Sequence, residues 1–331
     1  MDELGLAFWL SALITGLVFG YVIQRGGFCL TRAISNVVLM GDASIMRAYV
    51  LALLVAVVGV QLLVTFGLVE VPVRPFRWLA NIAGGLIFGV GMVLAGGCSG
   101  STWYRVGEGA VGAWVILIGF ALGATTANVG ALARVREWLQ ASEIRPGGAP
   151  PTLPSLLGLP AWPVIAVLAV AGAVWLARGP REGEHGKWAW PLTGAAVGLL
   201  IAGGWWSSTL GGRPVGITFA VNTGHMLTYP LVGYPNQATW SMVLLIGVPV
   251  GALIGALSKG DFRWKLPPGW SLVKIFGGGL LMGAAALVAD GCNITQGLTN
   301  SATLSAGSLL AFASMGVGAW LTLWALYLRK G

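Results

Sequence analysis

The chain has 331 residues, of which 56% are hydrophobic and only 9% are charged, and its mean hydropathy is +0.81. Soluble domains carry about 25% charged residues, so this composition excludes a water-soluble globular protein and predicts an integral membrane protein in contact with the lipid bilayer. The net charge of +8 is spread over short segments between apolar runs, which favours the positive-inside rule over binding to nucleic acid.

Nine apolar stretches approach the ~20 residues that a helix needs to cross a bilayer. Between some of them lie semi-apolar pieces that are too short to cross and suit broken or re-entrant half-helices buried in protein. We therefore predict an all-α polytopic membrane protein with about nine transmembrane helices plus short broken or re-entrant helices. The predicted spans are 5–24, 48–69, 77–96, 109–131, 161–177, 189–206, 239–257, 271–290 and 304–328, and the shorter pieces are 30–41, 99–106, 207–229 and 293–302.

The basic residues predict the orientation of these spans. If the crossings alternate, 13 of the 19 Lys and Arg fall on one side and 6 on the other. The richer side is cytoplasmic by the positive-inside rule, which places the N-terminus outside and the C-terminus inside a bacterial inner (plasma) membrane. The longest polar connection, 132–160, is then an external loop, and 178–187 is a cytoplasmic linker.

A glycine pattern occurs four times with identical spacing, and its end positions hold the only three cysteines of the chain. The first half, 1–131, and the second half, 188–331, each contain two copies. The segment 132–187 between them adds one span, and an odd span inverts the second half relative to the first, as in many transporters. The copies of Gly-x3-Gly-x8-Cys/Ser are Gly16-Gly20-Cys29, Gly85-Gly89-Cys98, Gly194-Gly198-Ser207 and Gly279-Gly283-Cys292.

Cys29, Cys98 and Cys292 are the candidate substrate-contacting residues. Each is predicted to lie where a helix breaks, and Ser207 is predicted to mark the same break without sulfur. Broken ends expose backbone N–H groups, which favour an anion, while a thiol adds a weak S–H donor and a soft sulfur. This combination suits a soft, sulfur-bearing anion. The absence of Cys-x-x-Cys spacing argues against a zinc or iron–sulfur site, so we expect no metal and no cofactor.

Several polar residues near the thiols have two interpretations each. Asp290 is either functional, because ionisable groups in membranes are expensive, or a partner for the broken backbone. Arg32, like Arg105, either attracts the anion or obeys the positive-inside rule. The remaining candidates, which line the broken ends or only satisfy freed backbone groups, are Ser99, Ser101, Asn293 and Gln296.

Tryptophans and histidines are weaker candidates. Most of the 16 tryptophans are predicted interfacial anchors, although Trp205 and Trp206, beside the third copy, are placed where they can narrow a path. The two histidines, His185 and His225, are isolated in the sequence. We interpret them as structural or solvated rather than as metal ligands.

Three segments around the cysteines resemble the motifs of the YeeE/YedE family of sulfur-transport membrane proteins. They are Gly-Gly-Phe-Cys-Leu-Thr-Arg at 26–32, Ala-Gly-Gly-Cys-Ser-Gly at 95–100 and Ala-Asp-Gly-Cys-Asn-Ile-Thr-Gln-Gly at 289–297. The resemblance implies an hourglass-shaped inverted-repeat fold and uptake of thiosulfate. It also implies a narrow central path in which the three cysteines contact thiosulfate in turn by S–H hydrogen bonds, with Cys98 at the narrowing, and a small TusA-like sulfur carrier as a cytoplasmic partner.

The residues leave more than one function open. The first is a transporter, not an enzyme, whose substrate is thiosulfate or another sulfur or selenium species. The second is a membrane thiol enzyme or sulfur-relay protein working by thiol–disulfide or persulfide exchange, which requires a resolving thiol near the nucleophile. A structural scaffold is the third. No phosphate-binding Gly-x4-Gly-Lys-Ser/Thr motif is present, so any ATP drive has to come from a partner.

Overall fold

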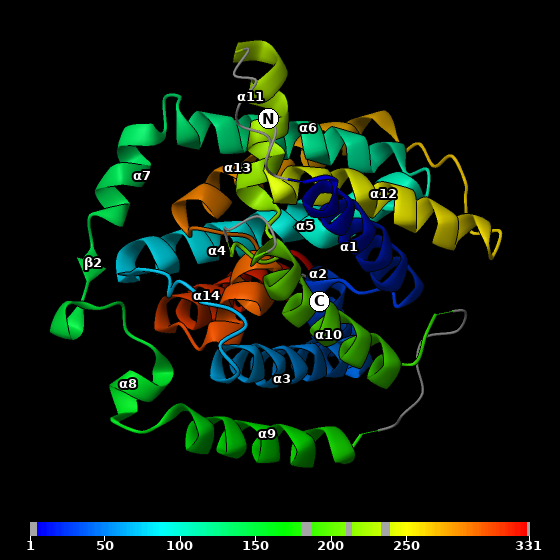
Figure 1. Ribbon diagram of the computed structural model, residues 1–331. Coiled ribbons are helices and arrows are strands. Elements are labelled where there is room, and N and C mark those ends of the chain that lie inside the picture. The colour runs from blue at the N-terminus through cyan, green and yellow to red at the C-terminus, as the bar shows by residue number, and fades with distance from the viewer. Residues whose placement is uncertain (1–4, 180–186, 210–213, 233–238, 330–331) are drawn as a thin grey trace.

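The structure, a computed structural model, describes residues 5–179, 187–209, 214–232 and 239–329. It is a bundle of long helices with short helices near its centre (Figure 1). The strands in the described part are β1 (Phe76–Arg77) and β2 (Glu143–Ile144), which pair antiparallel. The α-helices are α1 (Leu6–Arg25), α2 (Leu30–Met40), α3 (Ser44–Thr65), α4 (Trp78–Ala95), α5 (Ser99–Gly107), α6 (Val111–Asn128), α7 (Ala133–Gln140), α8 (Leu153–Leu157), α9 (Ala161–Ala177), α10 (Trp190–Thr209), α11 (Ala220–Val232), α12 (Trp240–Leu257), α13 (Gly269–Val288) and α14 (Ala306–Leu323).

The all-α membrane architecture is confirmed. Each of the nine predicted spans coincides with a helix, and seven helical segments in the described residues are long and apolar enough to cross a membrane. Two of the nine fall outside that set. The helix α9 is apolar but has only 17 residues, and α10, although 20 residues long, is not apolar enough. The predicted half-helices appear as α2, α5 and α11, and the fourth as the π-helical turn η3 (Thr295–Asn300).

The long helices pack in reciprocal pairs. Each copy of the glycine pattern begins a unit, which consists of a long helix, a short helix and a second long helix. The first long helix of each unit packs against the second long helix of a unit in the other half: α1 on α12, α10 on α3, α4 on α14 and α13 on α6. A side chain at Gly20 would overlap the carbonyl oxygen of Val248, and one at Gly16 that of Leu244. The small-residue pattern is therefore a packing device that lets backbones touch.

The register of these contacts also gives their direction. Along α1 and α12, residues 16 and 20 face 244 and 248, so the two helices run parallel, and the other three pairs follow the same rule. Because Trp188, just before α10, donates its backbone N–H to the carbonyl of Arg25 at the end of α1, α10 starts where α1 ends. This is the contact pattern that an inverted repeat produces; the repeat itself, and the boundaries 1–131, 132–187 and 188–331, stay predictions.

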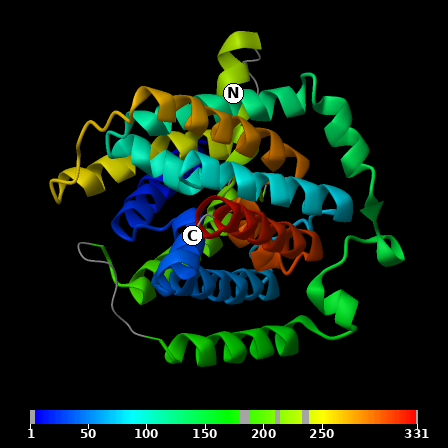
Figure 2. The same cartoon turned by 180° about the vertical axis from the view of Figure 1, so that it is seen from behind.

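The segment between the halves contains secondary structure that the sequence did not indicate. Residues 132–160 do not form a plain loop, because they contain α7, α8 and β2, and Arg77 forms an ion pair with Glu143 across the two strands at 3.3 Å. The helix α9 lies at the edge of the bundle beside α3 in both views (Figures 1 and 2). Its apolar side chains Val167 and Val170 are exposed, as expected of a helix that faces lipid.

Candidate functional site

Two of the thiols belong to the residue directly before a half-helix. Cys29 and Cys98 have extended backbones and precede α2 and α5, and their carbonyls accept the first backbone bonds, from Ala33 and Thr102, each at 2.9 Å. A residue in this N-cap position lies beside the unsatisfied N–H groups of the helix. The location of both thiols at broken helix ends therefore agrees with the sequence-based prediction.

The third thiol follows a sharper break. After α13 the chain passes through Asp290, which has a φ of 60°, and Gly291, which has a φ of 156°. The carbonyl of Cys292 then accepts the backbone N–H of Gln296 at 2.7 Å. Aspartate is one of the few non-glycine residues that tolerate the left-handed region, so this turn explains why Asp290 adjoins the motif.

The prediction of a helix break at Ser207 is wrong. Ser207 lies inside α10, which continues to Thr209, and the half-helix α11 begins only at Ala220. The residue before α11 is Phe219, which is fully buried and whose carbonyl accepts the backbone N–H of Thr223 at 2.9 Å. The third unit therefore carries an aromatic ring, packed against Phe19, where the other units carry a thiol.

All three cysteines are buried and free. The Cys29 thiol has the Cys98 thiol and the Ser101 hydroxyl as hydrogen-bonding neighbours, while the Cys292 sulfur lies 3.5 Å from the hydroxyl oxygen of Thr295. The hydroxyl of Tyr49, on α3, has all three thiols as electrostatic neighbours. The fold thus brings residues 29, 98 and 292 together around one tyrosine.

The predicted supporting residues divide into two groups. Ser101 donates to the Cys98 carbonyl at 3.0 Å and Gln296 donates to the carbonyl of Ala289, so both satisfy freed backbone groups. Ser99 instead donates to Asn293 at 2.9 Å, and Asn293 donates to the Tyr49 hydroxyl at 2.8 Å, which links three units by side chains.

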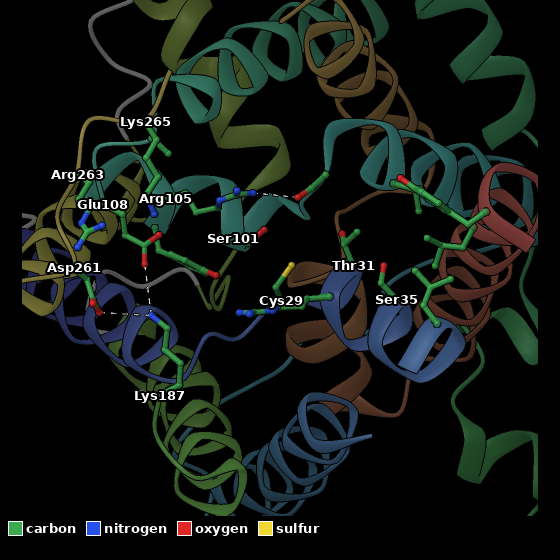
Figure 3. Close-up of a pocket in the computed structure, with 18 of the residues that line it drawn as sticks. Cys29, Thr31, Ser35, Ser101, Arg105, Glu108, Lys187, Asp261, Arg263 and Lys265 are labelled. Carbon is green, nitrogen blue, oxygen red and sulfur yellow. Dashed lines mark hydrogen bonds and ion pairs between the residues drawn. The ribbon is translucent and has the colours of Figure 1, made fainter. Parts of the chain in front are cut away.

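A large cavity, the Cys29 cavity, has a volume of about 680 Å³. Figure 3 shows Cys29, Thr31 and Ser101 on its wall together with charged side chains. Five cationic residues line it against two acidic ones, Glu108 and Asp261, so an anion is attracted. The five cationic residues are Arg32, Arg105, Lys187, Arg263 and Lys265.

Ion pairs moderate this positive field. The Lys187 ammonium lies 3.8 Å from Glu108 and 3.9 Å from Asp261, and Asp261 also lies 3.8 Å from the buried Arg25. Arg105 donates to the Gly96 carbonyl at 3.1 Å, which holds its guanidinium beside the turn that carries Cys98 (Figure 3). The predicted candidate Arg32 is thus one of five cationic residues that line the Cys29 cavity.

A smaller cavity, the Arg74 cavity, has a volume of about 230 Å³. It brings Arg74, His225 and Asp290 together, and it is also lined by Gly291 and Thr295, which flank the Cys292 position. Thr239 and Asn222, joined by a 2.7 Å hydrogen bond, complete a polar wall. Asp290 is thus the one predicted supporting residue that lines this cavity.

The two cavities lie at opposite ends of the bundle. Thr239, just before α12, lines the Arg74 cavity, whereas Gly260 and Asp261, just after it, line the Cys29 cavity. An 18-residue helix is about 27 Å long, which is close to the thickness of a bilayer core. Cys98, 1% exposed, is not on the wall of either cavity, and its thiol neighbours that of Cys29.

The structure does not support every weaker candidate. Trp206 is 49% exposed and faces outward, so it does not narrow a path, while Trp205 is buried and donates to the Thr299 carbonyl at 3.1 Å. His185 lies outside the described residues. Among the residues that the structure describes, no group of three or more His, Cys, Asp or Glu side chains is arranged to hold a metal ion.

Comparison with known proteins places these features in a family. A family model described as "Sulphur transport" matches residues 25–321. The chain is 32% identical over 329 residues to "Thiosulfate transporter TsuA" of Spirochaeta thermophila, covering 96% of this chain and 99% of that protein. It is 30% identical over 339 residues to the protein of the same name from Escherichia coli, covering 97% and 95%.

A shorter match, 34% identical over 117 residues, links the chain to "Probable transporter YedE" of Salmonella typhimurium, covering 34% of this chain and 28% of that protein. The resemblance to YeeE/YedE proteins is thereby confirmed, and a transporter is supported over an enzyme. The chain, a multi-pass membrane protein, belongs to the sulphur transport family.

Proposed function

We propose that this chain takes up thiosulfate along a path from the Arg74 cavity past Cys292, Cys98 and Cys29 into the Cys29 cavity. The observation that carries the proposal is that three buried, free thiols lie near two cavities at opposite ends of the bundle: Cys29 lines one cavity, and Gly291 and Thr295, on either side of Cys292, line the other. Two relatives that match nearly the full length are named thiosulfate transporters, which supports thiosulfate over other sulfur or selenium species.

The thiols act by hydrogen bonding in this proposal. Each S–H is a weak donor, and the N-cap positions of Cys29 and Cys98 add the positive end of a half-helix. Weak contacts in series hold an anion long enough to pass it on and still release it, as conduction requires. No covalent bond to the substrate is needed.

The charges distinguish the two ends of the path. Thiosulfate is a dianion, and the Cys29 cavity, with five cationic and two acidic residues, is the more positive end. We assign this end to the cytoplasm from the distribution of Lys and Arg along the chain. A small TusA-like sulfur carrier is the cytoplasmic partner we propose for the released anion.

Uptake of labelled thiosulfate into proteoliposomes tests the proposal. We expect Cys98→Ala to reduce the rate to below about a tenth, since a buried donor is lost at a position that reaches neither cavity. We expect Cys29→Ser and Cys292→Ser to keep part of it, because a hydroxyl also donates. Ser207→Ala is the control, because it removes a buried hydroxyl of α10 that lines neither cavity. A triple Cys→Ala variant that transports at the full rate would refute the path.

One observation favours thiol exchange as a second candidate, namely that the Cys29 and Cys98 thiols are neighbours. A disulfide between them releases two protons and passes two electrons to an oxidant, whereas a persulfide forms when a thiolate takes the outer sulfur of thiosulfate and sulfite leaves. Mass spectrometry of the protein after turnover separates the cases. Unmodified cysteines support hydrogen bonding alone, and a bridged or persulfidated Cys29 supports exchange.

A further inference from the structure

Tyr49 lies at the meeting point of the three thiols, on the buried face of α3. Its side chain is 2% exposed, and its ring stacks on Phe28 at 4.4 Å with an interplanar angle of 15°. The Tyr49 ring also stacks with Phe312, with the ring centroids 5.8 Å apart and an interplanar angle of 16°. Phe28 directly precedes Cys29 in the chain, so the same turn that presents the thiol also fixes the plane of the phenol ring.

The hydrogen bonds around Tyr49 have a direction. Ser99 donates to the side-chain carbonyl of Asn293, and the amide nitrogen of Asn293 then donates to the Tyr49 oxygen. An amide nitrogen only donates, so the phenol oxygen is an acceptor in this chain and its own proton is left over. Among the described residues, no group accepts a hydrogen bond from the Tyr49 hydroxyl.

A buried donor without an acceptor is unfavourable, and here the donor belongs to a ring that is held by Phe28 and Asn293, the chain neighbours of Cys29 and Cys292. Thiols are weak acceptors. A stronger acceptor at this place would satisfy the phenol, and an anion that passes among the thiols is such an acceptor.

We propose that Tyr49 is a substrate-binding residue that donates its O–H to the sulfonate oxygens of thiosulfate, while the thiols contact the terminal sulfur. This inference rests on the proposed function and deepens it, because it assigns the two chemically different ends of the anion to two kinds of donor. The hard O–H group binds the oxygen end and the soft S–H groups bind the sulfur end.

The experiment is thiosulfate uptake by Tyr49→Phe in proteoliposomes. Phenylalanine keeps the ring stack and removes only the hydroxyl, so we expect KM to rise about tenfold or more, as for a lost hydrogen bond to a charged group, with Vmax changed much less. Tyr21→Phe is the matched control, since Tyr21 loses the same atom but lines neither cavity. An unchanged KM in Tyr49→Phe overturns the inference.

Two further measurements keep the test decisive. If the wild type does not take up thiosulfate, the proposed function fails; if the wild type does and Tyr49→Phe matches it, only the role of Tyr49 fails. Should Tyr49→Phe unfold in a thermal melt, Ser99→Ala replaces it. Without the Ser99 hydroxyl, the Asn293 amide is free to turn and accept the phenol proton, so we expect a raised KM, and an unchanged KM again overturns the inference.

Discussion

The Cys29 cavity and the Arg74 cavity differ in size, charge and access to sulfur. The first has about 680 Å³, five cationic residues and a thiol on its wall; the second has about 230 Å³, one arginine, and two residues that flank Cys292 without the thiol itself. A large, strongly positive cavity concentrates anions with little discrimination. A small cavity with one arginine and one carboxylate can distinguish one anion from another. We therefore assign recognition of the anion to the Arg74 cavity and its collection after passage to the Cys29 cavity.

The largest expected difference between the cavities is in the chemical access to their thiols. In single-cysteine variants with the other two changed to Ser, we expect a membrane-impermeant maleimide to label Cys29 on the order of tenfold faster than Cys98 or Cys292, since reactivity follows exposure. The exposed fractions are 5%, 1% and 0%, and Cys29 alone lines a cavity.

Labelling in vesicles of known orientation also tests which cavity faces the cytoplasm. If the Cys29 cavity is cytoplasmic, the reagent reaches Cys29 in inside-out vesicles and not in right-side-out vesicles. Labelling of Cys29 only from the periplasmic side would reverse our orientation, and equal labelling of all three thiols would remove the difference between the cavities.

The next effect concerns Arg74, whose buried Nε has no hydrogen-bond partner among the described residues. We expect Arg74→Gln to raise the KM for thiosulfate about tenfold, because a direct bond from a charged donor to the anion is lost. Uptake kinetics check this, with Arg134→Gln as control, since Arg134 is exposed on α7 outside both cavities. Equal effects of the two changes would mean that only overall charge matters.

Much of the fold could be predicted from sequence because a membrane restricts the choices. The spans follow from the length of apolar runs, and the half-helices follow from short semi-apolar pieces. The positions of Cys29, Cys98 and Cys292 at helix ends followed from the repeat. The pattern misled us only at Ser207, because spacing along a helix does not determine where a helix stops, and α10 continues past that residue.

The two cavities and Tyr49 were beyond sequence reasoning. Tyr49 lies within a predicted span, and its role depends on Ser99 and Asn293, which come from two other units. Contacts over such sequence separations are set by tertiary packing. A signal was present nonetheless: Tyr49 is a polar-tipped ring among the buried alanines Ala48, Ala52 and Ala56 of α3, where a packing face alone needs small residues.

A weaker effect is expected in the Cys29 cavity. Arg263→Gln leaves four of the five cationic residues in place, so we expect KM to rise at most about fivefold, the range of an exposed charge interaction. Raising the salt concentration should reduce the difference between this variant and the wild type, because mobile ions screen exposed charges. An effect as large as that of Arg74→Gln would contradict the division into recognition and collection.

The smallest effect, and the one with opposite sign, is expected at Asp290. Its carboxylate lines the Arg74 cavity and repels a dianion that enters, so Asp290→Asn should lower the KM for thiosulfate by a few fold, within the range of about 1 kcal/mol for partly exposed charges. Asparagine tolerates the left-handed backbone as aspartate does, which keeps the turn at φ 60° intact. The comparison with Arg74→Gln is the most informative, because the two changes remove charges of opposite sign from the same cavity. A raised KM in both variants would mean that Asp290 holds the turn or Arg74 in place rather than opposing the anion.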